Sequence, residues 1–464
     1  MIQTKTANLC VILLLASVGV FAQTNEELTY RRNSLAEAMI YHSEDTFGTN
    51  IQEAFEIIPI ADKYDDHNIG VRVIDNDNIP NVRKRSHGLV KAEYGKSLNK
   101  EDIRLNGEML ERILNDADVA KYMVAKWFGW NIDTIRALSK DSEMDPTLRD
   151  SLLMDAMTMN MQLIQQRGQY NASDLDVQLA GHTARGVAAL SDAGEELIGN
   201  TFMLVNDMTY VTAEERAKVA KTTLSVIGGL FDAFTGGEAG RDMAKTAAKI
   251  ADSFTGFTVR THSYLYQLQW NDSIAAIFYN DYYTANPRLE REKVQAFLSD
   301  TTSFRVKYVA HEYEFDGKSE LKGKYDRREL VKMVCTRSID KNIAALQLAY
   351  EDFKVKTPVH EIVTNAHGKV IGYSAKIGMK EGITDQSKFQ VIQRLIDPET
   401  GKSTYKHIAD LRPVKGEIWD NRYNAVLEEA VDADLNATLF KKVAGGEILP
   451  GMLIIEGKYK KVTQ

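Results

Sequence analysis

Two His-Glu pairs are the residues of this 464-residue chain that come nearest to a metal-binding motif. A helical zinc protease needs a second histidine four residues after the first, so that both rings lie on one face of the helix. Neither His311-Glu312 nor His360-Glu361 is followed by that histidine. The sequence therefore predicts no zinc centre at either pair.

Two further segments match known binding loops only in part. The acidic segment 75–78 begins like a calcium loop, but Pro80 occupies the position of the required glycine and Ser86 that of the bidentate glutamate. The glycines of 181–186 are spaced as in a phosphate loop, yet no Lys-Ser follows them. We interpret the first segment as a solvated turn and the second as part of a helix.

Catalytic motifs are equally sparse. The chain has no Gly-x-Ser-x-Gly elbow for an acyl hydrolase. Glu312 and Glu314 share one face of an expected strand and could supply the acid and base of a glycosidase, but pairs like this arise by chance among 65 acidic residues. The sequence thus predicts no catalytic, cofactor-binding or metal-binding residue. An exported hydrolase with a site built from distant carboxylates remains the alternative.

Residues 1–22 have the pattern of a secretory signal peptide. Lys5 supplies a positive charge, an uncharged stretch runs from Leu9 to Phe21, and small residues precede a cleavage point after Ala22. The stretch is shorter than the roughly 20 residues that a membrane span needs. We therefore expect export, periplasmic or outer-membrane-associated, rather than an N-terminal anchor.

Removal of that segment also removes Cys10, so Cys335 becomes the only cysteine and no internal disulfide can form. We expect Cys335 to be a buried, inert thiol of a helix, with a catalytic thiol as the alternative. The formal net charge is −8 with both signs interspersed, which predicts no nucleic-acid binding. The basic cluster 83–85 is interpreted as a solvated loop, and an anion or lipid-headgroup site is the alternative.

The elements that would position any site predict an α+β fold. Residues 23–198 form a mainly helical region, with a capping box at 34–37, one short strand at 71–74 and a helix opened by Pro146. Residues 199–356 form a mixed α/β domain. Its expected elements are strands at 201–205, 262–270, 275–279 and 304–313 and a long helix at 327–353.

Residues 357–464 read as short strands joined by glycine-containing turns. Such a turn lies at 365–368, another at 397–401 and a third at 444–446. Strands at this spacing predict a small antiparallel β-barrel-like domain.

An amphipathic helical hairpin is predicted at 213–256, between two expected strands. The apolar face of its first helix includes five residues that could contact a partner or a membrane surface: Val219, Val226, Ile227, Leu230 and Phe234. Glycines at 236, 237 and 240 make the reversal. Packing on its own domain, an oligomer contact and membrane-surface association all remain open, whereas the apolar run is too short to span a bilayer.

The C-terminal segment resembles the small β-domain of a flagellar outer-ring protein and of related curli-export-type envelope proteins. The residues that carry the resemblance lie at 377–383, 389–391 and the Asp-Pro-Glu-Thr-Gly turn 397–401. The segments 30–35 and 195–207 resemble a family of uncharacterised exported proteins of Gram-negative bacteria. Both resemblances imply an envelope location and a non-enzymatic role in assembly, scaffolding or binding, and neither implies catalytic residues.

Overall fold

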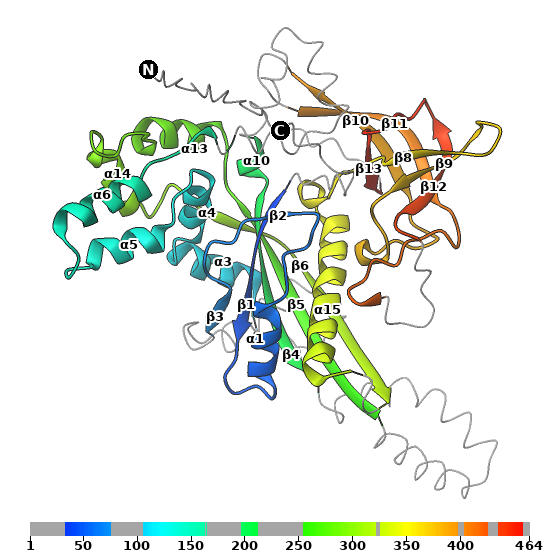
Figure 1. Ribbon diagram of the computed structural model, residues 1–464, viewed down its shortest axis with the longest axis horizontal. Coiled ribbons are helices and arrows are strands. Elements are labelled where there is room, and N and C mark those ends of the chain that lie inside the picture. The colour runs from blue at the N-terminus through cyan, green and yellow to red at the C-terminus, as the bar shows by residue number, and fades with distance from the viewer. Residues whose placement is uncertain are drawn as a thin grey trace, which may run out of the picture.

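The computed structural model describes residues 33–75, 105–162, 164, 196–211, 254–321, 325–397, 403–425 and 435–457. The protein is a mixed α+β structure built around two β-sheets. Figure 1 shows sheet A at the centre, a group of helices on one side of it and sheet B on the other. Residues 213–253 of the predicted hairpin lie outside the described residues, and so does the signal segment 1–22. The undescribed part of the hairpin includes its five apolar positions Val219, Val226, Ile227, Leu230 and Phe234.

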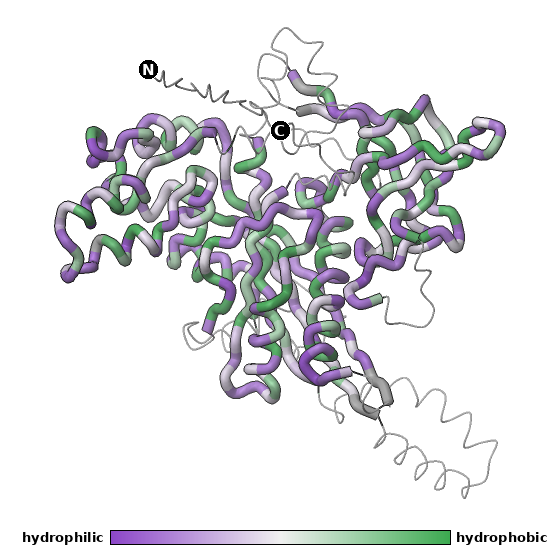
Figure 2. Tube along the Cα trace, in the orientation of Figure 1, coloured by the Kyte–Doolittle hydropathy of each residue, from purple (hydrophilic) through white to green (hydrophobic). Residues whose placement is uncertain are grey.

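Sheet A has the strand order β2-β1-β4-β5-β6, with β3 also paired to β1. Strand β1 runs parallel to β2, β3 and β4, whereas β4, β5 and β6 are antiparallel neighbours. The bounds of its strands are β1 Ser34–Tyr41, β2 Asp65–Asp66, β3 Val73–Asp75, β4 Thr201–Tyr210, β5 Phe254–Leu268 and β6 Val306–Leu321. Apolar segments run through the central strands, and many peripheral loops are hydrophilic (Figure 2).

Two layers of helices cover the faces of sheet A, and each encloses its own hydrophobic core. Helices α1 (Gly48–Glu56) and α15 (Arg327–Ala349) cover one face. The other face carries α3 Gly107–Asp116, α4 Val119–Trp127, α5 Ile132–Lys140, α6 Pro146–Ala156, α10 Glu196–Gly199, α13 Asp272–Ile277, the π-helical turn η2 Phe278–Tyr282 and α14 Arg291–Ser299. A parallel β1-β4 pair requires a long crossover, and the helices between these strands lie within it.

Helix α15 is tied to the sheet by a buried polar contact. Asn342 Nδ2 donates to the carbonyl oxygen of Thr261 at 3.0 Å and to Ser263 Oγ at 2.8 Å. The predicted long helix is confirmed from Arg327 to Ala349, where it ends at the extended Tyr350, and a separate 3-10 turn, η3 (Glu351–Phe353), follows.

Sheet B is antiparallel and curls into a half-barrel with the order β7-β13-β10-β11-β12-β9-β8. This confirms the β-rich C-terminal segment, including the turn at 365–368 between β8 and β9. Its elements are β7 Thr357–Pro358, β8 Glu361–Thr364, β9 Val370–Ala375, the 3-10 turn η4 Met379–Glu381, β10 Phe389–Ile396, β11 Ser403–Pro413, β12 Thr438–Gly445 and β13 Leu453–Glu456.

Three of the sequence-based expectations were wrong. The capping box at 34–37 does not start a helix but lies in β1, where parallel pairing buries nearly every side chain. The strand expected at 275–279 is helical, because Asn271 caps α13 by accepting from the backbone of Ser273 and Ile274. The hairpin cannot extend to 256, since β5 already begins at Phe254.

Candidate functional site

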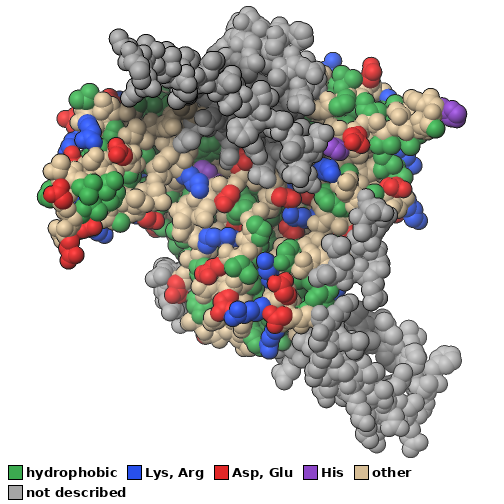
Figure 3. Space-filling model, in the orientation of Figure 1, with side chains coloured by type: hydrophobic (Ala, Val, Ile, Leu, Met, Phe, Trp, Pro, Cys, Tyr) green, Lys and Arg blue, Asp and Glu red, His purple; other side chains and the backbone are tan. Residues whose placement is uncertain are grey.

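A cavity of about 300 Å³ lies where α15 and β6 meet the β-rich segment, and we call it the junction cavity. Helix α15 contributes one face to it, because residues spaced by three or four positions point the same way. Its lining includes apolar Met333, Val334 and Met379 together with charged side chains of both signs. Acidic and basic groups are likewise mixed on the surface that carries α1 and α15 (Figure 3).

Asp340 lines this cavity and is 9 % exposed. Burial raises the pKa of its carboxyl to about 7, against the opposing effect of Lys380. Its Oδ2 has no hydrogen-bond partner among the described residues. Asp340 is therefore a carboxyl that can gain or lose a proton near neutral pH.

Glu37, in the middle of β1, is the second unusual carboxyl. It is 4 % exposed, and neither of its oxygens has a hydrogen-bond partner in the described part of the chain. Burial raises its pKa to about 8, opposed by Arg72 and reinforced by Asp340. A buried carboxyl without hydrogen bonds is stable mainly in its neutral form.

The β-rich segment reaches this site through η4. Lys380 Nζ lies 3.1 Å from Asp62 Oδ1, and Asp340 and Glu381 are also close enough to raise the pKa of that ammonium group. Glu381 Oε2 accepts from the backbone of Gly378 at 2.6 Å and from Asn421 Nδ2 at 2.8 Å, which holds η4 in place.

Most cations around the junction cavity already have protein partners. Lys341 Nζ lies 3.1 Å from Glu314 Oε1 and 3.2 Å from Asp316 Oδ2. Arg337 donates to the carbonyl oxygen of Tyr423 at 2.8 and 3.0 Å, a direct link between α15 and the β-rich segment. The lining thus combines apolar side chains with charged ones, most of which are paired. It suits a polar ligand that carries a small apolar group.

A row of ionisable side chains crosses the opposite face of sheet A. His42 Nε2 lies 3.0 Å from Asp207 Oδ1, and Asp207 is the cross-strand partner of His262. His262 Nδ1 lies 2.9 Å from His311 Nε2. Burial and the neighbouring His262 lower the pKa of His311 to about 3, so its ring is neutral at physiological pH. Among the described residues, no cluster of three or more His, Cys, Asp or Glu side chains could hold a metal ion.

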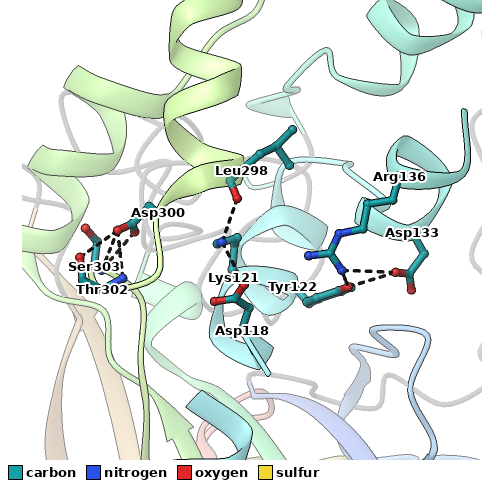
Figure 4. Close-up of polar contacts among 9 residues, drawn as sticks. All are labelled: Asp118, Lys121, Tyr122, Asp133, Arg136, Leu298, Asp300, Thr302 and Ser303. Atoms are coloured by element: carbon teal, nitrogen blue, oxygen red, sulfur yellow. Dashed lines mark hydrogen bonds and ion pairs between the residues drawn. The ribbon is translucent and has the colours of Figure 1, made fainter. Parts of the chain in front are cut away.

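Polar contacts in the helical region bind helices together (Figure 4). Lys121 Nζ contacts Asp118 Oδ2 and the carbonyl oxygen of Leu298, both at 3.2 Å, and so joins α4 to α14. Tyr122 donates to Asp133 Oδ1 at 3.0 Å, which joins α4 to α5. We assign these contacts a structural role.

The residues weighed in the sequence occupy ordinary positions where the structure describes them, whereas the segments 76–78, 83–85, 181–186 and 398–401 lie outside the described residues. Cys335 is buried, and burial raises the pKa of its thiol to about 12, which fits the inert rather than the catalytic reading. Glu314 is paired with Lys341, so Glu312 and Glu314 do not act as two free carboxyls. His360 lies 3.9 Å from Glu361, on the surface.

Sequence reasoning missed Glu37, Asp340 and the histidine row. Glu37 and Asp340 are about 300 positions apart, and nothing in the local pattern marks Asp340. A carboxylate inside a run of apolar residues, Leu35 to Ile40, was the one available signal for Glu37.

No protein-family model matches this chain, and no curated protein matches it either. Across the part of the chain that the structure describes, no helix is both long and apolar enough to cross a membrane.

Proposed function

We propose that this protein is a non-enzymatic, exported envelope protein with an assembly, scaffolding or binding role, and that the junction cavity receives a partner. The location of the cavity carries the proposal, because ligand sites form preferentially where two structural units meet. The cavity lies between α15 of the central part and η4 of the β-rich segment.

The lining indicates the chemistry of the partner. Met333, Val334 and Met379 offer a small apolar surface, and paired charges surround it. A short polar peptide segment bearing one apolar side chain fits this combination better than a large lipid or a nucleic acid. Export, with cleavage after Ala22, would bring the cavity to envelope partners.

A second contact is proposed for the predicted hairpin. Its apolar positions Val219, Val226, Ile227, Leu230 and Phe234 would face another envelope protein, a second copy of the chain or the membrane surface. This contact is independent of the junction cavity and has a separate test below.

Site-directed photocrosslinking in intact cells tests the cavity. The crosslinking amino acid replaces Met379, which is 41 % exposed and lines the cavity. Leu395, 43 % exposed and on β10 of sheet B, is the matched control. We expect a discrete adduct from position 379 and none of that mass from position 395. The same adducts from both positions, or none from 379, would contradict the proposal.

One observation favours hydrolysis as a second candidate. Asp340 has a pKa of about 7, suited to a general acid or base, and interacts with the buried Glu37. Turnover of glycoside or peptide substrates by the wild type, lost in Asp340→Asn, would establish the hydrolase and displace the binding role. Activity that survives in Asp340→Asn would exclude Asp340 as its acid or base.

A further inference from the structure

Strand β6 forms one edge of sheet A, because β5 is the only described strand that pairs with it. Side chains of α3 cover the beginning of this edge. Asn115 Oδ1 accepts from the backbone N–H of Val306 at 2.8 Å, and Glu111 Oε2 accepts from that of Tyr308 at 2.7 Å. Helix α3 therefore takes the place of a neighbouring strand at this end of β6.

The far end of β6 also directs polar backbone groups away from β5. The carbonyl oxygen of Thr258 accepts from the backbone N–H of Val211 at 2.9 Å, so the polar backbone groups of Thr258 point toward β4. Thr258 is the cross-strand partner of Gly317, and the pair is therefore one that exchanges no hydrogen bond between β5 and β6. The N–H and C=O of Gly317 consequently point outward, and the N–H donates to Asp316 Oδ1 at 2.8 Å.

The same outward direction recurs at every second residue of this part of β6. The pairing of β5 with β6 is regular from Phe254 to Leu265, so Tyr313 and Phe315 also direct their N–H and C=O groups outward. In the described part of the chain, no backbone group from outside the β5–β6 pair hydrogen-bonds to Tyr313, Phe315 or Gly317. We call residues 313–317 the open edge. An extended polypeptide can add to such an edge through main-chain hydrogen bonds.

The open edge borders the junction cavity. Asp316, Gly317 and Lys318 all line the cavity. Consecutive side chains of a strand point to opposite faces, so a cavity that meets three residues in a row lies along the edge of the strand rather than over one face. Met333 and Met379 belong to the same lining. A segment paired with β6 would therefore bring a side chain against these two methionines.

The charges beside the open edge restrict the side chains of such a segment. Lys341 of α15 lies 3.1 Å from Glu314 Oε1 and 3.2 Å from Asp316 Oδ2, so both carboxylates lie on the face of β6 that α15 covers. Glu312 lies on the same face, two positions before Glu314. Like charges in neighbouring strands are destabilising, so the segment should carry neutral or basic side chains on this face. A second copy of β6 paired about Phe315 would instead place Glu314 opposite Asp316.

We propose that the partner of the junction cavity is an extended polypeptide segment of another protein, which adds to β6 as a further strand of sheet A. This inference rests on the proposed function, because it states how the partner of that cavity is held. The outward groups of Tyr313, Phe315 and Gly317 bind the main chain of the segment. One apolar side chain of the segment contacts Met333 and Met379.

Photocrosslinking from β6 in intact cells tests the added strand. A benzophenone analogue of phenylalanine replaces Phe315, whose side chain lies on the face opposite α15 because Glu314 and Asp316 face that helix. An added strand has side chains on both faces of the sheet, so position 315 should give the same adduct as position 379. An adduct from 379 but none from 315 would overturn the added strand and leave the cavity proposal standing.

Tyr308 is the matched control, since it is also an aromatic residue of β6 but its N–H is already bound by Glu111. The same analogue at position 308 should give no adduct of that mass. Equal adducts from 308 and 315 would overturn the assignment to the open edge. An adduct of twice the mass of the chain from 315 would identify a second copy as the occupant and would also overturn it.

A proline at position 315 tests the main-chain contact itself. Proline has no N–H, and an edge strand tolerates it where that N–H would face outward. With the crosslinker at 379, Phe315→Pro should lower the adduct yield roughly tenfold further than Phe315→Ala, which removes the same side chain but keeps the N–H. Equal yields from the two variants would contradict the added strand.

The outcomes separate this inference from the proposed function. An absence of any adduct from position 379 would contradict the proposed function, and the added strand with it. Should Phe315→Pro fail to fold, the comparison of positions 315 and 308 decides, because both keep the backbone of β6 intact.

Discussion

Glu37 links the stability of the fold to pH. Burial raises its pKa from 4.5 to about 8, so the folded state holds this proton more tightly than the unfolded chain does. The stabilising contribution is complete below about pH 4.5 and is lost as the pH rises toward 8 and beyond.

Replacing Glu37 by Gln should therefore flatten the pH dependence of folding. Between pH 5 and pH 9 we expect the free energy of unfolding to fall by on the order of 3 kcal/mol less in the variant than in the wild type. Urea denaturation at a series of pH values measures this difference. If the free energy of unfolding changed with pH equally in the two proteins, ionisation of Glu37 would not destabilise the folded state, which would contradict this prediction.

Cys335 should be unreactive in the native state, since burial raises the pKa of its thiol to about 12 and the thiolate is the reactive form. In a chain that starts at Gln23 we expect almost no reaction with a thiol reagent at pH 8, and one thiol per chain after denaturation. Rapid reaction in the folded protein would mean that Cys335 is accessible.

The residue scale also shows where sequence reasoning ends. The burial of Cys335 was predicted from the sequence, because no His or Asn that could activate the thiol lies near it along the chain. The pairs Glu37–Asp340 and His262–His311 were out of reach, because pKa shifts arise from contacts between distant segments.

At the scale of elements, length and periodicity decided what could be predicted. Helix α15 repeats its apolar pattern over 23 residues, and Asp145 with Pro146 marks the start of α6, so both were found. Strand β1 was mistaken for the start of a helix because Ser34 and Glu37 have the spacing of a capping box, and only pairing with β4 overrides that local signal.

Two glycines of sheet B provide a matched test of packing. Gly445 and Gly416 have φ values of +102° and +83°, but a Cβ at Gly445 would lie 2.4 Å from the Ile408 carbonyl oxygen, whereas Gly416 faces open space. Gly445→Ala should therefore cost at least about 1 kcal/mol more than Gly416→Ala. Thermal or urea denaturation compares them, and equal losses would contradict this account of β12.

At the scale of the whole molecule, the start of β5 sets the limit of the deletion that tests the predicted hairpin. Strand β5 starts at Phe254 and extends five residues beyond its pairing with Tyr210, so a deletion must end at residue 253. A linker that replaces the deleted residues must also reach from the end of β4 to Phe254, along the five residues of β5 that lie beyond its pairing with Tyr210. At the usual rise per residue this distance is about 17 Å. We expect deletion of 212–253 to reduce oligomeric mass or liposome binding while the fold is kept. Unchanged behaviour in both assays would exclude this contact.

The most direct test of the account is the N-terminus and location of the protein in the cells that make it. Both the proposed envelope role and an envelope partner for the junction cavity require that the protein is exported. Cell fractionation with N-terminal mass spectrometry should find a chain that begins at Gln23 in the periplasmic or outer-membrane fraction. A chain that keeps residues 1–22 and stays in the cytoplasm would contradict the central claim.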